Sequence, residues 1–215
     1  MRTASIFLAY AIVGTVCEAT PLVVLAAQRC RPRGARAWTA LWVAYLLAIN
    51  IVGSWLASRG IHNLWLSYVL MPVSVGLALW ALSYWQSAEV WRLTFRIGIV
   101  PLLLAWGVLT LAVESTSSFS RAAEPMAKLV TLGAAAFTLL SGSLAHRGDL
   151  LRQDWFWISA GMVLYFGSGA TLGPVSALLV GRAPQMLTFV YGVWALIFGL
   201  AFLLIARGMA CPPAP

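Results

Sequence analysis

One carboxyl group stands inside a long apolar segment of this chain, and its chemistry needs explaining first. Glu18 lies near the middle of the segment 4–27, whose other residues are nearly all apolar or small. A segment of that length can cross a bilayer. The charged form of a carboxyl is costly in hydrocarbon, so an ionisable residue there is a functional hypothesis by default. We expect Glu18 to be protonated, and in one of the two interpretations given below it acts as a hydrogen-bond donor.

Polar residues of other apolar segments fall at a similar depth. Counting about 1.5 Å of rise per residue places Glu18 within roughly 4 Å of the middle of its segment. The other members of this layer are Asn50, Ser74, Thr138, Tyr165 and Ser168. Gly161, Tyr165 and Ser168 also share one helical face, because they are spaced by three and four residues.

Two interpretations of this layer stay open. Its groups either hydrogen-bond to one another and hold the bundle together, or they line a mid-membrane cavity that binds a small molecule or passes a proton, with Glu18 as its acid. Our hypothesis for a ligand site is the set Glu18, Asn50, Ser74, Thr138, Tyr165 and Ser168. A Glu18→Gln variant that loses stability but keeps ligand binding would contradict the second interpretation.

Several kinds of catalytic or cofactor site are excluded by missing residues. The only lysine is Lys128, so the last apolar segment cannot form a retinal Schiff base. His62 and His146 lie on different loops, which excludes a haem held by two histidines. Asp149 and Asp154 share one loop and cannot face each other across a membrane as a protease dyad.

Other motifs fail on their details. Ser168 follows Phe166-Gly167, whereas a rhomboid nucleophile needs Gly two places before the Ser. Pro184-Gln185 resembles the PQ-loop of sugar and amino-acid transporters but has no earlier counterpart. The three cysteines form no CxxC pair, and no phosphate-binding glycine loop exists. We therefore expect no enzymatic activity, no cofactor and no metal site.

Composition defines the class of protein that positions these residues. Of the 215 residues 61% are hydrophobic and only 9% are charged, with a mean hydropathy of +0.88. Soluble domains carry roughly 25% charged residues. We predict an all-α membrane protein, an up-and-down bundle of seven transmembrane helices, in a single domain over residues 1–208 with a short tail at 209–215. The predicted spans are about 4–27, 37–57, 65–85, 93–113, 125–145, 155–180 and 186–206.

The arginines predict the orientation of the bundle. With the N-terminus outside, the cytoplasmic set would be Arg29, Arg31, Arg33, Arg36, Arg92, Arg96, Arg147, Arg152 and Arg207, and the outer set Arg2, Arg59, Arg121, Lys128 and Arg182. Nine basic residues against five favour an N-out, C-in topology. The net charge of +8 is explained by these loops and by anionic lipid, so we expect no nucleic-acid partner.

Helix ends and packing positions are also indicated. We expect membrane-interface anchoring by Trp65, Trp85, Trp91, Trp155 and Trp157. Asp154 is the predicted N-cap of the sixth helix, and Lys128 is expected to form a simple i,i+4 pair with Glu124. Close helix packing is predicted at Gly161, Gly169 and Gly173, of which the last two form a GxxxG motif.

Several local patterns occur together along the chain: Glu18-Ala-Thr-Pro21, a basic first loop, His62-Asn63-Leu-Trp65 leading to Pro72, Glu124, Asp154-Trp-Phe-Trp157 and Tyr165-Phe-Gly-Ser168. Together they resemble a family of small bacterial seven-helix membrane proteins, common in Bacteroidetes, whose activity is not established. The chain departs from the family at Leu70-Met-Pro-Val-Ser74, where members show Tyr and Glu, and at Trp194, near a recurring His. The resemblance implies a multi-pass protein of the bacterial inner membrane.

Three functions remain open. The first is a non-catalytic, sensor-like or receptor-like bundle that binds a small apolar or amphipathic ligand and acts through a membrane partner or as a homo-oligomer. The second is a small-solute or proton-coupled transporter, supported by Glu18 and by helices expected to break at Pro21, Pro72, Pro101 and Pro174. The third is an accessory subunit of a larger membrane complex.

Overall fold

A computed structural model shows seven long α-helices and one short 3₁₀ helix. The structure describes residues 2–29, 31–114, 120–146, 148–179 and 182–211, so Cys30 and Arg147 lie outside the described residues. The α-helices are α1 (Arg2–Ala27), α2 (Ala35–Ser58), α3 (Trp65–Ser83), α4 (Glu89–Ala112), α5 (Ala123–Ala145), α6 (Asp154–Leu179) and α7 (Pro184–Ala210), and the 3₁₀ helix is η1 (Leu150–Arg152). The predicted seven-helix bundle is confirmed.

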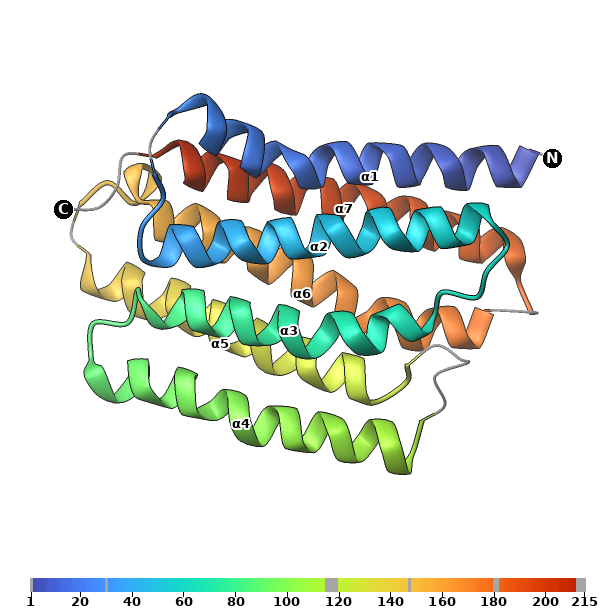
Figure 1. The fold of residues 1–215 in the computed structure, drawn as a ribbon. Coiled ribbons are helices and arrows are strands. Elements are labelled where there is room, and N and C mark those ends of the chain that lie inside the picture. The colour runs from blue at the N-terminus through green and yellow to red at the C-terminus, as the bar shows by residue number, and fades with distance from the viewer. Residues whose placement is uncertain (1, 30, 115–119, 147, 180–181, 212–215) are drawn as a thin grey trace.

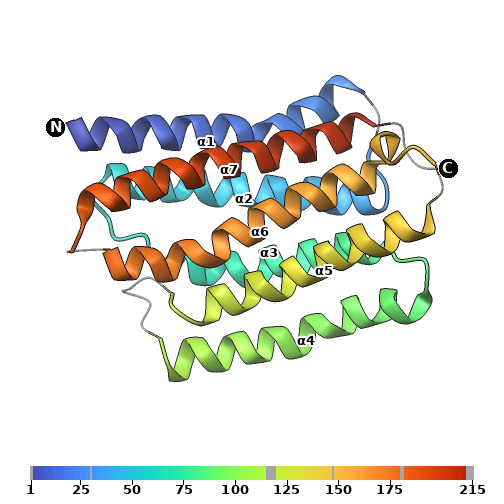
Figure 2. The same cartoon turned by 180° about the vertical axis from the view of Figure 1, so that it is seen from behind.

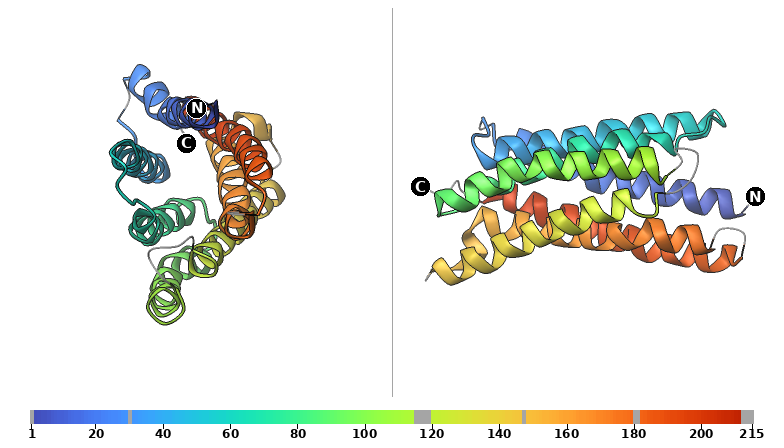
Figure 3. Two further views of the ribbon diagram at one scale, coloured as in Figure 1. Left: turned by 90° about the vertical axis from the view of Figure 1, so that its right-hand side faces the viewer. Right: turned by 90° about the horizontal axis from the view of Figure 1, so that it is seen from below.

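The helices form an elongated up-and-down bundle with the termini at opposite ends (Figure 1). Each helix packs against its neighbours in sequence, and α1 packs against α7, so the seven helices close into a ring. The end-on view in Figure 3 shows α1 and α7 at one edge and α4 at the other. Seen from behind, α6 lies between α7 and α5 (Figure 2).

An aromatic cluster fills the middle of the ring. Trp42 of α2 is fully buried and stacks on Phe166 and Phe202, with ring centroids 5.7 and 6.2 Å apart. Tyr165 meets Trp42 edge-on at 5.3 Å. Such rings contribute large apolar contact areas. This cluster joins α2 to α6 and α7 across the centre of the bundle.

The outer surface is strongly apolar, which fits a bilayer environment. Six helices, α2 to α7, are long and apolar enough to cross a membrane, and the apolar part 12–27 of α1 continues the pattern. Leu111 and Leu144 are 89% and 87% exposed. Soluble proteins rarely expose so much contiguous apolar surface. The chain is a multi-pass helical membrane protein.

Two local expectations are wrong. The helices α1, α3, α4 and α6 continue through Pro21, Pro72, Pro101 and Pro174, so the expected breaks are not present. Trp155 is only 4% exposed and packs against Gly142, where an added Cβ would lie 2.5 Å from the indole. Trp155 therefore packs inside the bundle, whereas Trp65 and Trp91 remain exposed, as interface anchors would be.

Buried Arg36 organises the end of the bundle near the C-terminus. Its guanidinium donates to the carbonyls of Gly208 (3.0 Å), Met209 (2.9 Å) and Cys211, and its Nε lies 3.4 Å from Asp154 Oδ2. Asp154 Oδ1 accepts from the Trp155 amide at 2.7 Å. A cation at a helix C-terminus satisfies carbonyls that have no partner within the helix. Arg36 of α2 thus joins the start of α6 to the end of α7.

At the opposite end of the bundle, Glu114, which follows α4, binds the start of α5. Its Oε1 accepts from the amides of Arg121 (2.7 Å), Ala122 (2.6 Å) and Ala123 (3.2 Å) at the start of α5, and Ser120 Oγ donates to its Oε2 at 2.8 Å. Burial acts to raise the pKa of Glu114, but these hydrogen bonds outweigh it and hold the pKa below its ordinary value.

The three glycines predicted for helix packing have different neighbours. A Cβ on Gly161 would lie 2.6 Å from the Ala201 carbonyl oxygen, so Gly161 allows close approach of α7. On Gly169 it would lie 2.8 Å from Lys128 Nζ, and on Gly173 2.8 Å from the Ser120 carbonyl oxygen. The GxxxG motif therefore accommodates a lysine and a loop carbonyl.

Candidate ligand-binding site

The predicted polar layer contains one interhelical hydrogen-bonded pair, Glu18 with Asn50. Asn50 Nδ2 of α2 lies 3.0 and 2.8 Å from Glu18 Oε1 and Oε2 of α1. Glu18 is only 1% exposed. In these contacts the carboxyl oxygens accept, whereas the interpretation in which the layer holds the bundle together made Glu18 a donor. The interaction orients the Asn50 amide, whose oxygen can accept a hydrogen bond and receives none from a described residue.

Ser74 and Thr138 bond elsewhere, to groups that the sequence did not indicate. Trp42 Nε1 donates to Ser74 Oγ at 2.8 Å, which ties α2 to α3. Gln86 Nε2 donates to Thr138 Oγ1 at 2.8 Å and joins the end of α3 to α5. Both hydroxyls are buried and already accept a hydrogen bond from a protein group. Their geometry is that of interhelical bonds within the bundle.

Within the part of the chain that the structure describes, Tyr165 and Ser168 make no side-chain hydrogen bond to Glu18 or Asn50. The Tyr165 ring belongs to the aromatic cluster, with Phe198 and Phe202 centroids at 5.8 and 5.7 Å. Ser168 Oγ donates to the Leu164 carbonyl of its own helix at 2.7 Å. Whether any residue of the predicted set touches a ligand stays a prediction, and Asn50 is the member placed best for it.

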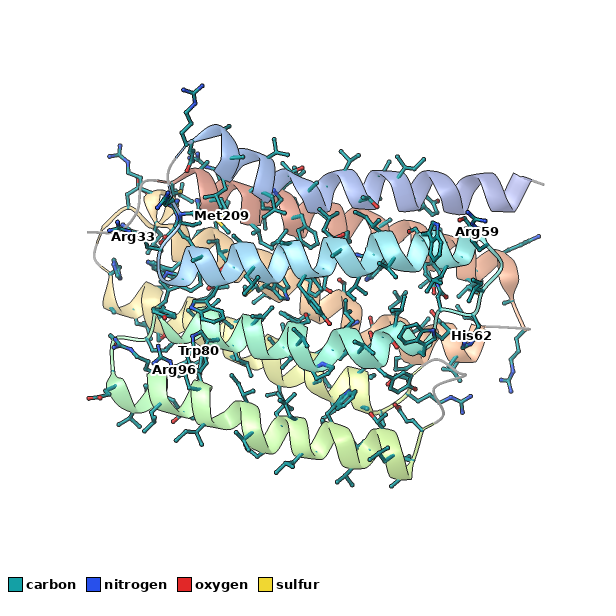
Figure 4. All side chains as sticks on the ribbon, in the orientation of Figure 1. Arg33, Arg59, His62, Trp80, Arg96 and Met209 are labelled. Atoms are coloured by element: carbon teal, nitrogen blue, oxygen red, sulfur yellow. The ribbon has the colours of Figure 1, made fainter. Side chains whose placement is uncertain are left out.

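Asn50 lines two neighbouring cavities near the end of the bundle opposite the C-terminus. The first, about 260 Å³, is called the polar cavity here. Its lining includes Asn50, Gly53, Asn63, Ser67, Ser120, Glu124, Gly173, Ser176 and Tyr191. These residues come from α2, α3, α6, α7 and the start of α5, so the cavity lies where five segments converge. His62, labelled in Figure 4, marks this end of the molecule.

The second cavity, about 250 Å³, is called the aromatic cavity. It is lined by Tyr10, Gly14, Thr15, Asn50, Ser54, Tyr191, Trp194, Ala195 and Phe198, from α1, α2 and α7. Asn50 and Tyr191 border both cavities. A polar compartment and a mostly apolar one thus meet at a shared pair of residues.

The charged groups beside the polar cavity neutralise each other. Lys128 Nζ lies 2.5 Å from Glu124 Oε1 and donates to the Gly169 carbonyl at 3.1 Å. Lys128 is 7% exposed. The sequence predicted the i,i+4 pair but not its burial against α6. Glu124 therefore brings a carboxylate to the cavity wall whose charge is already compensated.

Each cavity also contains a buried donor that has no partner among the described residues. Ser176 Oγ, on the wall of the polar cavity, is buried and makes no hydrogen bond, and neither does the buried Nε1 of Trp194 beside the aromatic cavity. A polar atom left unpaired in the interior costs about 1–3 kcal/mol. A bound molecule with acceptor groups would satisfy both donors.

Sequence reasoning missed most of this site. Ser120 and Ser176 belong to no motif, and Asn63 was singled out only as part of the stretch His62-Asn63-Leu-Trp65, so only the fold brings these residues together. Within the described residues, no group of three or more His, Cys, Asp or Glu side chains is close enough to hold a metal ion.

Fold and site together define a polytopic helical membrane protein with a two-compartment cavity among its helices. Comparisons of the chain with protein-family models, with curated proteins and with solved structures give no match. The functional argument therefore depends on the site itself.

Proposed function

We propose that this protein is a non-catalytic, receptor-like membrane bundle that binds a small amphipathic molecule in the polar and aromatic cavities. The observation that carries the proposal is the pair of unpartnered buried donors, Ser176 Oγ and Trp194 Nε1, one in each compartment. Ligand pockets typically measure roughly 300–1,000 Å³. Each compartment is slightly smaller, so a ligand of ordinary size occupies both, with Asn50 and Tyr191 at the junction.

The charge balance favours an uncharged ligand. The Glu124 carboxylate of the polar cavity is paired with Lys128, and the Glu18 carboxyl is bonded to the Asn50 amide. Neither group therefore presents a free counter-ion to a charged head group. A desolvated charge without a partner costs several kcal/mol. Hydroxyl or amide groups, in contrast, would match the Ser176 donor and the Asn50 oxygen.

Transport is the second candidate, and Glu18 beside the cavities is the observation in its favour. The features of a transporter core are weaker than the sequence suggested, because α1, α3, α4 and α6 are continuous through their prolines. Unwound segments with exposed helix ends are what such cores use to bind substrates. A receptor needs only a ligand whose binding favours one arrangement of the helices.

The test uses a short-chain monoacylglycerol as an uncharged amphipathic probe, together with mass spectrometry of molecules that co-purify in mild detergent. Binding should raise the thermal unfolding temperature of the wild type, and Ser176→Ala and Trp194→Phe should reduce that rise. Matched controls are Ser159→Ala and Trp155→Phe, because these residues also carry buried unpartnered donors but do not line either cavity.

The proposal fails if the probe and every co-purifying molecule stabilise the four variants equally. Flux of the bound molecule into proteoliposomes that disappears in Glu18→Gln would support the transporter instead. Tight co-purification with a larger complex, with both cavities filled by a partner's side chains, would support the accessory-subunit alternative.

Topology and location belong to the same proposal. We place the N-terminus outside and the C-terminus in the cytoplasm of a bacterial inner membrane, on the arginine asymmetry and on the resemblance to small bacterial seven-helix proteins. Arg29, Arg31, Arg33 and Arg36 precede or begin α2 at the end where α7 finishes. A reporter that is active only in the cytoplasm, fused to the C-terminus, should be active, and an inactive fusion would reverse the orientation.

A further inference from the structure

Arg96 of α4 is held in a fixed position near the end of the bundle where α4 begins. Its guanidinium carbon lies 4.7 Å from the ring centroid of Trp80 and 5.1 Å from that of Tyr84, and its Nε donates to Ser83 Oγ at 3.0 Å. Figure 4 shows Trp80 and Arg96 together between α3 and α4 at this end. The terminal guanidinium nitrogens make no hydrogen bond to a described residue, so they remain available to an anion.

An apolar groove of about 420 Å³ runs from Arg96 along α3 and α4. Its other lining residues are Trp38, Val73, Gly76, Leu77, Trp80, Ile99 and Val100. Val73 and Val100 are 44% and 59% exposed, which shows that the groove opens on the outer side of the bundle, where the bilayer lies. An apolar groove with a cation at one end matches a lipid that has an apolar acyl chain and an anionic head group.

We propose that this groove binds one anionic phospholipid, with an acyl chain between α3 and α4 and its phosphate on the Arg96 guanidinium. The planar guanidinium presents paired donors to phosphate oxygens. Arg96 lies seven residues after Glu89, the first residue of α4, which is about 10 Å of helix. Arg92, one turn earlier, does not line the groove and donates to the Gln86 carbonyl at 3.2 Å, but it adds positive charge to the same end of α4. This site is separate from the polar and aromatic cavities and does not depend on the proposed function.

The test measures lipid binding to the full-length protein in mild detergent, by native mass spectrometry and by thermal unfolding. The probes are dioleoyl phosphatidylglycerol, dioleoyl phosphatidylcholine and inorganic phosphate. Phosphatidylglycerol should be retained and should raise the unfolding temperature more than phosphatidylcholine. Arg96→Gln should weaken phosphatidylglycerol binding about fivefold, the factor expected for one arginine at an anionic lipid surface.

Two further variants keep the test decisive if Arg96→Gln proves unstable. Gly76→Leu should block the seat of the acyl chain, because a Cβ there only touches Ile99 at 3.9 Å while a longer side chain extends into the groove. Arg59→Gln is the matched control, since Arg59 also lies over a tryptophan, Trp55, but is not part of the groove.

The expected result is loss of phosphatidylglycerol preference in Arg96→Gln and Gly76→Leu and its retention in Arg59→Gln. Equal binding of both lipids by the wild type would overturn the proposal. So would equal stabilisation by inorganic phosphate, which would show an anion site without an acyl chain. An unchanged preference in Gly76→Leu would place the lipid elsewhere.

Discussion

Removal of the Lys128 ammonium tests how the polar cavity is held together. In Lys128→Met the Glu124 carboxylate, whose side chain is 19% exposed, loses its cation, and the Gly169 carbonyl loses a donor. Breaking a buried ion pair from one side costs about 3–5 kcal/mol. We expect the lower end, about 3 kcal/mol, because Glu124 keeps some exposure. For a chain of this length that lowers the unfolding temperature by about 6–12 °C.

The double variant Lys128→Met/Glu124→Gln separates charge from packing. It removes the stranded carboxylate and should recover all but about 1 kcal/mol, the remainder being the lost hydrogen bond from Lys128 to the Gly169 carbonyl. Arg152→Gln is the control, since the Arg152–Asp149 pair, at 3.3 Å, is 83% and 54% exposed and should contribute nothing measurable. Unfolding is followed by near-ultraviolet absorbance in mixed micelles. A double variant as unstable as Lys128→Met would refute the electrostatic reasoning.

Three other changes have definite expected outcomes. Arg36→Met should cost about 3 kcal/mol by stranding Asp154 and the α7 carbonyls, whereas Arg33→Met, at an exposed position, should not change the unfolding temperature. Gly161→Ala should cost about 1–3 kcal/mol because its Cβ meets the α7 backbone, and Gly133→Ala, with nothing within 4 Å, should be neutral or slightly stabilising. The pKa of Glu114 is lower in the folded state than its ordinary value of 4.5, so Glu114 stabilises the folded protein at a pH above 4.5, and this contribution disappears as the pH falls through the lowered pKa. Glu114→Gln should therefore flatten the acid side of a plot of unfolding temperature against pH.

The sequence predicted the architecture well because lipid imposes one solution on a long apolar segment. Within hydrocarbon the backbone must satisfy its own hydrogen bonds, so each apolar run becomes a helix. The predicted spans differ from the observed helices by at most four residues at any end, as at α4, which begins at Glu89 and not at 93. Such boundaries are soft since polar residues can extend a helix beyond the apolar core.

Partners of polar groups were harder to predict, because depth along a helix does not determine the direction of a side chain. Glu18 and Asn50 have similar depths and do meet, but Ser74 at that depth bonds to Trp42 and Tyr165 lies among aromatic rings. Arg36 looked like one of several topology-setting arginines, yet it is buried on the carbonyls of α7. Its distinguishing contacts come from residues more than 170 positions away in sequence.

The two ends of α2 and α7 connect the candidate site to the opposite face of the membrane. Asn50 of α2 and Tyr191 of α7 border both cavities, and at the other end Arg36 of α2 holds the last carbonyls of α7. A ligand that changes the spacing of α2 and α7 at the cavities therefore acts on helices whose far ends meet at one side chain. Coupling of this kind requires an element with two arrangements that binding favours unequally.

The thiol of Cys211 reports on that far end. Cys211 is 4% exposed, burial raises its pKa, and its carbonyl is bound by Arg36, so its maleimide reaction should be slow while the contact persists. In a variant with Cys17 and Cys30 replaced by Ser, we expect the monoacylglycerol probe to change the labelling rate, and Asn50→Ala to abolish the change. A labelling rate that is identical with and without saturating probe would show that binding at the cavities does not reach the Arg36 contact.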